Sequence, residues 1–419
     1  MTTAPPVRAA SALDALNFFL ADVQGGLGPY LAVYLLTVRH WDEARIGIVL
    51  SVAGIAGIVA QAPSGALVDA LHAKRALIAI AAAAVTGLAM ALAVLTGFWG
   101  VALVQAATGI CGAVFGPAIG AVSLGIVGHW RFARRNGRNE AFNHAGNAFA
   151  AGVAGVSAYF FGPVAVFALL AMMALASLAS VLTIPAGAID HEVARGLPNG
   201  DSKHREQPSG LVFLVHSRPL LIFTACVVLF HLANAAMLPL VGQKLALENR
   251  NLGTAAMSVC ILGAQLVMVP MAILVGRKAD SWGRKRLFLA GFLILPIRGA
   301  LYTLSDDPVW LIGVQLLDGV GAGLFGALFP LIVADLTWGT GRFNVTRGAV
   351  QAAQGIGASL STTIAGLIVV THGYSAAFLA LAAIAAAGLV LFWLVMPETR
   401  NIDQRAAALH QSALRRAAE

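Results

Sequence analysis

Long uninterrupted apolar runs limit the folds open to this chain more than any other feature. About 20 apolar residues are enough to cross the hydrocarbon core of a bilayer. Only 11% of the residues are charged, against about 25% in a soluble domain, so lipid must be the solvent for most of the chain. We count twelve runs, at residues 11–38, 44–70, 75–97, 99–128, 139–161, 163–186, 218–243, 253–276, 285–305, 308–334, 343–371 and 374–396.

The apolar runs are continuous, which predicts helices. Backbone groups in lipid must be paired within the protein, so only helices or a closed barrel can span the membrane. Barrel strands alternate apolar and polar residues, and these runs do not. We therefore predict an all-α membrane protein with twelve transmembrane helices.

One long polar stretch divides the six earlier runs from the six later ones. The predicted organisation is an N-terminal six-helix bundle (1–186), a cytoplasmic linker (187–217), a C-terminal six-helix bundle (218–396) and a cytoplasmic tail (397–419).

The two halves share sequence features at a constant spacing. Asp69 and Asp280 each follow four residues after a Gly, and they are 211 positions apart (280 − 69). Phe115-Gly116 and Phe325-Gly326 are 210 apart. Two parallel six-helix halves related by an axis normal to the membrane are a known plan for transporters, so we predict two pseudo-symmetric bundles.

The distribution of Lys and Arg predicts the orientation in the membrane. With both termini and the linker in the cytoplasm, 22 of the 27 Lys and Arg residues lie on the inner side. The net charge of +8 then reflects the membrane surface, and we expect no nucleic-acid partner. The chain resembles a bacterial inner-membrane protein in its short loops and Ala-rich composition.

The sequence offers little for catalysis. The three Cys residues lie within apolar runs without metal-ligand spacing, and there is no His/Asp/Glu cluster, nucleophile pair or nucleotide-binding Gly-Lys-Ser/Thr loop. We expect no enzyme activity, no metal and no cofactor.

The loop between the eighth and ninth runs carries the pattern Gly-xxx-Asp-xx-Gly-Arg-Lys, and the loop after the second run carries a degraded copy. Together with the six-plus-six organisation, these two loops make the chain resemble the major facilitator superfamily. The resemblance implies that these loops hold a cytoplasmic gate shut; the alternative is that their charges only anchor the topology. The gate candidates are Gly65, Asp69, Lys74, Arg75, Gly276, Asp280, Gly283, Arg284 and Lys285.

The second copy of the loop is the more complete one. In the first copy His72 and Ala73 stand where the family pattern has a Gly and a basic residue. The sequence therefore predicts that Asp280→Asn impairs transport more than Asp69→Asn.

Ionisable residues deep in apolar runs are functional candidates because they are costly there. Asp22 lies near the middle of the first run, with Asn17 and Gln24 nearby, and we expect it to bind a coupling proton or, alternatively, to cap a broken helix. The resemblance places the first, fourth, seventh and tenth helices around a central cavity. The candidates on the fourth, seventh and tenth helices are Gln105, His231, Asn234, Gln315 and Asp318. Arg298 of the ninth run is a further candidate.

Two of these candidates carry specific expectations. Arg298 and Asp318 should pair, either as a structural salt bridge or as a coupling site. Gln105 occupies a position where many proton-coupled members of the family have an Arg. That departure, and the missing Gly-Pro signature of the fifth helix, weaken the likeness to drug–proton antiporters.

Polar residues also share one face of the fifth and of the eleventh run. They either join helices by hydrogen bonds or contact substrate. They are Glu140, Asn143, His144, Asn147, Gln351 and Gln354.

These observations predict a monomeric secondary active transporter that moves a small organic solute by alternating access, coupled to protons. Export of drug-like compounds or metabolites is the first direction, and uptake of a metabolite or organic anion is the second. The alternative from another class is a membrane receptor or scaffold that does not transport.

Overall fold

The computed structural model of the chain describes residues 7–24, 27, 31, 34–35, 38–41, 43–161, 164–197, 216–248 and 250–400. Secondary structure in these ranges is helical, which confirms the predicted fold class. Eight helical stretches are long and apolar enough to cross a membrane. The count of twelve spans stays a prediction. Residues 198–215 of the predicted linker and 401–419 of the predicted tail lie outside the described ranges.

The described α-helices follow the order of the predicted spans. Their bounds are α1 Val7–Gln24, α3 Glu43–Ala70, α4 Lys74–Val94, α5 Phe98–Gly112, α6 Phe115–Val127, α7 His129–Phe161, α8 Ala165–Thr183, α10 Arg218–Asn234, α11 Met237–Glu248, α12 Arg250–Trp282, α13 Arg284–Leu301, α14 Pro308–Leu336 and α15 Phe343–Val395.

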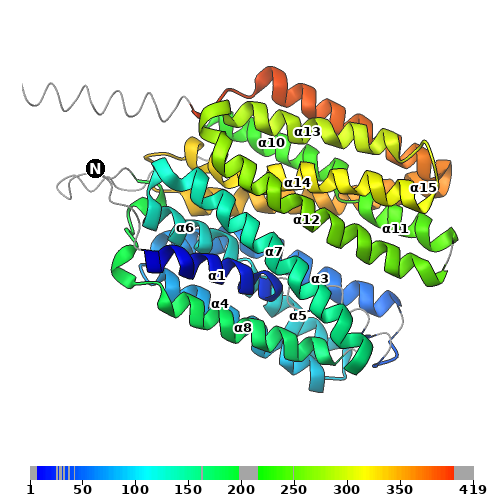
Figure 1. Cartoon of the computed structure of the whole chain (residues 1–419), viewed down its shortest axis with the longest axis horizontal. Helices are drawn as coiled ribbons and strands as arrows, with labels where there is room; N and C mark the ends of the chain where they lie inside the picture. Colours follow the sequence, from blue (N-terminus) through cyan, green and yellow to red (C-terminus); the bar gives the residue numbers. More distant parts are fainter. Residues whose placement is uncertain are drawn as a thin grey trace, which may run out of the picture.

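The helices lie in two groups that follow the two halves of the chain (Figure 1). In the first group α1 packs on α7 and α8, and α4 packs on α5 and α8. In the second group α15 packs on α10 and α13, and α14 packs on α12 and α13. The groups meet where α7 packs on α12 and α3 packs on α15. A binding site built from both halves would therefore lie at the interface where the two groups meet.

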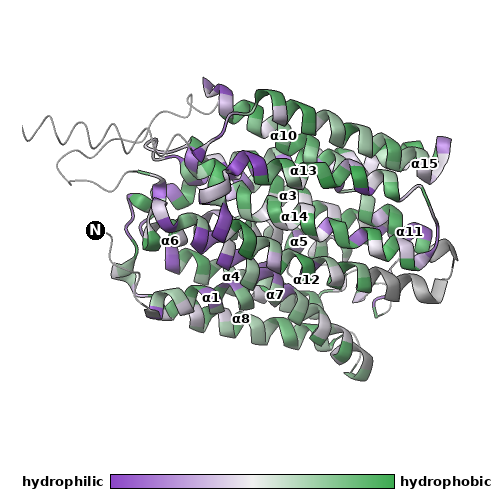
Figure 2. Ribbon diagram, turned by 45° about the horizontal axis from the view of Figure 1, so that its top comes forward, coloured by the Kyte–Doolittle hydropathy of each residue, from purple (hydrophilic) through white to green (hydrophobic). Residues whose placement is uncertain are grey.

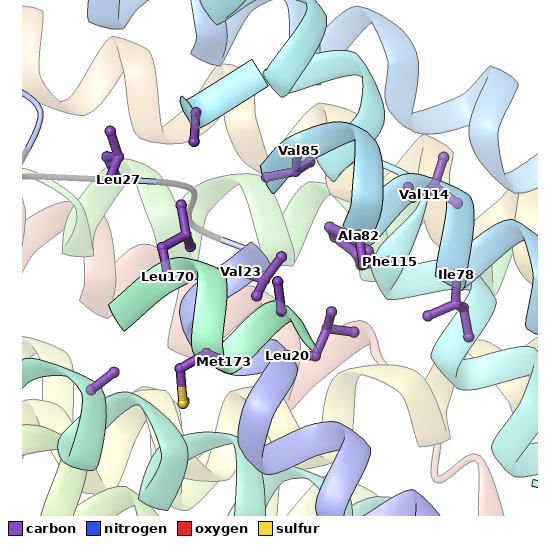
Figure 3. Packing of buried hydrophobic residues seen from close by; sticks show 14 of the residues in the cluster. Leu20, Val23, Leu27, Ile78, Ala82, Val85, Val114, Phe115, Leu170 and Met173 are labelled. Atoms are coloured by element: carbon purple, nitrogen blue, oxygen red, sulfur yellow. The ribbon is translucent and has the colours of Figure 1, made fainter. Parts of the chain in front are cut away.

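Apolar packing gives each half its own interior. In the first half Leu20 and Val23 of α1 meet Ile78 and Val85 of α4 and Phe115 of α6 (Figure 3). The second half is held by a cluster of aromatic rings, among them the stacked pairs Phe230–Phe325 and Phe288–Phe392. Other apolar side chains point outward and are highly exposed, as a lipid-facing surface requires.

Four predicted spans differ in continuity from the sequence prediction. The fourth is broken into α5 and α6, and the seventh into α10 and α11. At the second break the Ala236 amide donates to Ser361 Oγ at 3.0 Å. This hydrogen bond supplies the partner that the amide lacks within its own helix. The eleventh and twelfth predicted spans run together as α15, with a kink at Gly373, whose φ of 81° suits glycine.

Hydrophilic residues gather at one end of the molecule (Figure 2). This is the end where α3 and α12 stop and α4 and α13 start, and it carries Lys74, Arg75, Arg277, Arg284 and Lys285. We call it the basic end.

Candidate functional site

A cavity of about 640 Å³ lies between the two halves. Its walls come from α1, α3, α5 and α15, together with Leu27 and Ala113, so both halves contribute. This volume is within the range of small-molecule sites in proteins. Five lining residues are glutamines: Gln24, Gln61, Gln105, Gln351 and Gln354.

Four of these glutamines are residues that the sequence singled out. Gln24 and Gln105 come from the first half, and Gln351 and Gln354 come from the second. Gln61 was missed, although a polar side chain deep in an apolar run is the signal that selected Gln24. The cavity therefore joins candidates that the sequence placed in two separate groups.

Asn17 and Asp22 are not in the cavity wall. Asn17 is buried and donates to the Leu13 carbonyl of its own helix at 2.7 Å. Asp22 is half-buried, and within the described part of the chain nothing donates a hydrogen bond to its carboxylate.

Four candidates of the second half, Asn234, Arg298, Gln315 and Asp318, form one network. The Arg298 guanidinium pairs with Asp318 and donates to Asn234 Oδ1 at 2.5 Å. Gln315 Nε2 donates to Asp318 at 3.1 Å and its Oε1 accepts from Tyr302 at 2.5 Å. Arg298 and Asp318 are thus neighbours, as the sequence predicted. The cavity wall does not include this network.

His231 and the polar face of α7 have other partners. His231 Nδ1 lies 3.1 Å from the Val227 carbonyl of its own helix, and its ring packs on Phe325. His144 Nδ1 lies 2.8 Å from Gln265 Oε1 of α12, so it joins the two halves. Glu140 interacts electrostatically with His144 and with Arg347 of the other half. Asn147 is half-buried.

The Asp69 side chain joins the two halves at the basic end. Its carboxylate accepts from Asn344 Nδ2 at 2.8 Å and from the Val345 amide at 2.9 Å. Val345 is in the first turn of α15, where backbone amides lack a partner within the helix. A carboxylate is favourable there because the helix dipole is positive at its N-terminus. Asp69 is only 3% exposed. A side chain from one half therefore caps a helix of the other.

Gly65, one turn before Asp69, permits this approach. A Cβ at Gly65 would lie 2.2 Å from the Asn344 carbonyl oxygen and 2.8 Å from the Val345 Cα. Both are backbone atoms of α15 and cannot move aside independently.

Gly65→Ala is therefore expected to prevent full closure of the basic end. Overpacking of this kind costs about 1–3 kcal/mol, and each 1.4 kcal/mol corresponds to about tenfold in an equilibrium. We expect the transport rate in liposomes to decrease on the order of tenfold. Gly87→Ala is the matched control, because a Cβ at Gly87 of α4 meets nothing within 4 Å. Equal rates for both variants would contradict the packing argument.

The neighbouring basic candidates of the first half bind carbonyl groups. Lys74 is buried and donates to the Leu71 carbonyl at 2.7 Å. Arg75 donates to the Leu182 carbonyl at 2.8 Å, near the end of α8. A cation at the C-terminus of a helix is favourable, so Arg75 ties α4 to α8 within the first half.

The second loop copy is mostly engaged within its own half. Asp280 pairs with Arg284 at 2.7 Å, and Arg284 pairs with Asp335 at 3.0 Å. Glu398 accepts from the Arg284 and Lys285 amides at 2.9 and 3.1 Å. A polar contact across the halves comes from His129, whose Nε2 lies 3.5 Å from Asp335.

Two glycines of this second copy have separate roles. Gly276 faces Gly137 of α7, so that α7 and α12 approach closely. Gly283 precedes α13 with a φ of 89°, which favours glycine.

The geometry reverses the expected ranking of the two loop copies. Asp69 in the degraded copy is buried and binds the other half, whereas Asp280 in the complete copy is 55% exposed and binds its own. A physical reason lies in the start of each partner helix. α15 begins at Phe343, so the Val345 amide is free to be capped. The partner helix of the second copy is α7, which begins at His129. The α7 backbone that packs on Gly276 therefore lies inside the helix and not at its start.

Asp14 was not predicted as a site residue. It is buried and accepts from Arg135 at 2.5 Å and from Arg138 at 2.6 Å. Arg135 also donates to Asn139, and Asn139 donates to Ser123. This cluster joins α1, α6 and α7 within the first half.

The sequence profile of the Major Facilitator Superfamily matches residues 13–337 and 226–417 of the chain. The chain belongs to the Major Facilitator Superfamily. Two proteins of Mycobacterium tuberculosis, from strains CDC 1551/Oshkosh and H37Rv, are each 58% identical to it over 402 residues. The alignment covers 96% of this chain and 96% of each relative, and both are named uncharacterized MFS-type transporters.

Solved structures share the fold at low sequence identity. The proton:xylose symporter XylE has a TM-score of 0.70 at 12% identity, covering 95% of this chain and 98% of XylE. The human organic anion transporter MFSD10 has a TM-score of 0.68 at 14% identity, covering 93% of this chain and all of that one. A single-residue mutant of the nucleoside transporter NupG has a TM-score of 0.64 at 17% identity, covering 92% of this chain and 99% of that one.

Family membership decides the class of activity. The chain is a multi-pass membrane transport protein, not an enzyme, as the sequence predicted. The direction of transport, the coupling ion and the orientation of the termini belong to the proposal below.

Proposed function

We propose that this chain is a secondary active transporter that moves a small organic solute by alternating access through the cavity between its halves. The observation that carries the proposal is the combination of that cavity with contacts that close the basic end. The cavity takes walls from both halves, and Asp69 binds α15 across them. Breaking the Asp69 contact would let the halves separate at this end and expose the cavity there.

The contacts between the halves suit repeated opening. Gly65 and Gly348 bring α3 and α15 together, and Gly137 and Gly276 do the same for α7 and α12. Small residues let helices pack closely through backbone contacts. Among the described residues, polar contacts also cross this interface at separate points, such as that of Asn136 with the Ala327 carbonyl at 2.9 Å. Rigid halves can therefore rock about these crossings.

Protons are the proposed coupling ion, and Asp22 is the proposed binding group. Asp318 is held by Arg298 and Gln315, so its carboxylate is already neutralised and hydrogen-bonded. Asp22 is half-buried in α1, and no described residue forms an ion pair with it. A carboxylate in such a place is free to take up and release a proton during the cycle.

Asp22→Asn is expected to abolish accumulation driven by a pH gradient while leaving exchange of solute across the membrane intact, because only the driving step needs the proton. Both quantities are measured in liposomes, with and without an imposed gradient. Asp14→Asn is not a suitable control, because Asp14 holds two arginines. Asp307→Asn is one, because Asp307 is exposed and its role as the N-cap of α14 is one that Asn also fills. Unchanged gradient-driven accumulation in the Asp22 variant would remove the coupling role.

The proposed setting is a bacterial inner membrane, with the basic end and both termini in the cytoplasm and the monomer as the working unit. The excess of Lys and Arg on the proposed inner side supports the orientation. Export is the proposed direction. Liposomes with defined protein orientation test it: net movement toward the basic end under the physiological gradient would instead indicate uptake.

A further inference from the structure

The described residues of the cavity wall are mostly amides and apolar groups. Besides the five glutamines, the polar side chain among them is Thr108, whose hydroxyl donates to the Val104 carbonyl of its own helix at 2.9 Å. Among the described residues that line it, none is charged and none is aromatic. Such a wall offers hydrogen bonds in both directions, because each amide has two acceptor sites and two donors.

Two of the amide oxygens have no partner. Oε1 of Gln61 and Oε1 of Gln351 are buried, and neither accepts a hydrogen bond from the described residues. Gln61 comes from α3 in the first half, and Gln351 comes from α15 in the second. A buried acceptor without a donor costs about 1–3 kcal/mol. Both side chains also line the cavity, and a turn of the amide about its last bond would bring the oxygen to a donor on an occupant. An occupant that donates to both would span the walls of the two halves.

The absence of charge among the described lining residues disfavours two classes of solute. An organic cation would find neither a carboxylate nor an aromatic ring among these residues. An organic anion would need a cation, and the nearest one along α15 is Arg347, one turn before Gln351. The Arg347 guanidinium lies against Gly120 of α6, and Arg347 does not line the cavity. A charged solute would therefore lose its hydration without a counter-charge.

We propose that the solute is uncharged and rich in hydroxyl or amide N–H donors, in the manner of a polyol, a sugar or a nucleoside. This inference rests on the proposed use of the cavity as the substrate site. It narrows the wider class of drug-like compounds and metabolites to polar neutral metabolites. Gln61 and Gln351 accept from the solute, and Gln24, Gln105 and Gln354 complete its hydrogen bonds.

Matched sets of solutes test the class. Each set contains a neutral polyol, sugar or nucleoside, its carboxylate derivative and its amine derivative, and an apolar amphiphile completes the panel. Binding to the purified full chain is measured as the ligand-dependent shift of its melting temperature and converted to Kd. At least one neutral solute is expected to bind at least tenfold more tightly than both of its charged derivatives.

Variants of the wall connect the binding to the glutamines. Gln61→Leu and Gln351→Leu are each expected to weaken binding of the neutral solute at least tenfold, and Gln351→Glu is expected to shift preference toward the amine derivative. Gln243→Leu is the matched control, because Gln243 is an exposed residue of α11 outside the cavity.

The outcomes separate this inference from the proposed function. Tighter binding of a charged or apolar solute, failure of every neutral solute to bind, or neutral binding that Gln61→Leu and Gln351→Leu leave unchanged would overturn the inference. Flux of a charged solute in liposomes would then leave alternating access standing. Neutral solutes that bind with the expected dependence on the glutamines but never cross the membrane would support the inferred class and contradict the transport proposal.

Discussion

Asp69→Ala is expected to lower the transport rate at least about tenfold, whereas Asp280→Ala should change it less than about fivefold. Asp69 accepts two hydrogen bonds from the opposite half, and hydrogen bonds to a charged group contribute about 1.5–3 kcal/mol. Asp280 is 55% exposed and pairs within its own half, and exposed ion pairs contribute only about 0.2–1 kcal/mol. Since 1.4 kcal/mol corresponds to about tenfold, the two variants should be well separated.

The measurement is the initial rate of solute flux in liposomes, normalised to the amount of correctly folded protein. Both substitutions remove a carboxylate from the same position of the two loop copies, so each controls for the other. A larger defect in Asp280→Ala would contradict the assignment of Asp69 as the contact that closes the basic end.

Arg298→Leu is expected to lower the free energy of unfolding by about 3–5 kcal/mol. Arg298 is 1% exposed and pairs with Asp318, so the substitution leaves a buried carboxylate without its counter-charge. The substitution also removes the hydrogen bond to Asn234. Thermal unfolding of the purified protein measures the loss, and the control Asp307→Asn should change stability by no more than about 1 kcal/mol, because Asp307 is exposed and Asn caps a helix as well as Asp does.

The double variant Arg298→Leu with Asp318→Leu decides what this pair does. Replacing both partners of a buried ion pair by apolar residues is often neutral, so stability should return most of the way. If the pair is structural, as its hydrogen bonds favour, transport driven by a proton gradient should return with it. Recovered stability without gradient-driven transport would make Asp318 the coupling carboxylate in place of Asp22.

Much of the fold could be predicted from residue patterns because lipid allows few alternatives. Continuous apolar runs predicted helices, and the repeated Gly-xxx-Asp loops predicted two related halves. The breaks between α5 and α6 and between α10 and α11 were not predicted. They depend on tertiary partners such as Ser361, whose hydroxyl receives the Ala236 amide from a distant helix.

The site could be predicted only where a polar residue stands out from an apolar run. That signal selected Gln24, Gln105 and the Arg298–Asp318 pair. It could not show that Gln351 and Gln354 share one cavity with Gln24 and Gln105, because this depends on how α15 crosses α3. The ranking of Asp69 and Asp280 was reversed for a similar reason. A complete motif does not show where the partner helix begins. Because α15 begins at Phe343, the Val345 amide has no partner within the helix and can donate to Asp69.

The distance between the two halves at the basic end tests alternating access most directly. Spin labels are placed at Ala70 of α3 and Lys278 of α12, both exposed, after Cys111, Cys226 and Cys260 have been replaced. Double electron–electron resonance in lipid should show mostly a short distance in the parent protein and a large additional population at longer distance in Asp69→Ala. One unchanged distance in both proteins, with or without a transported solute, would contradict the account.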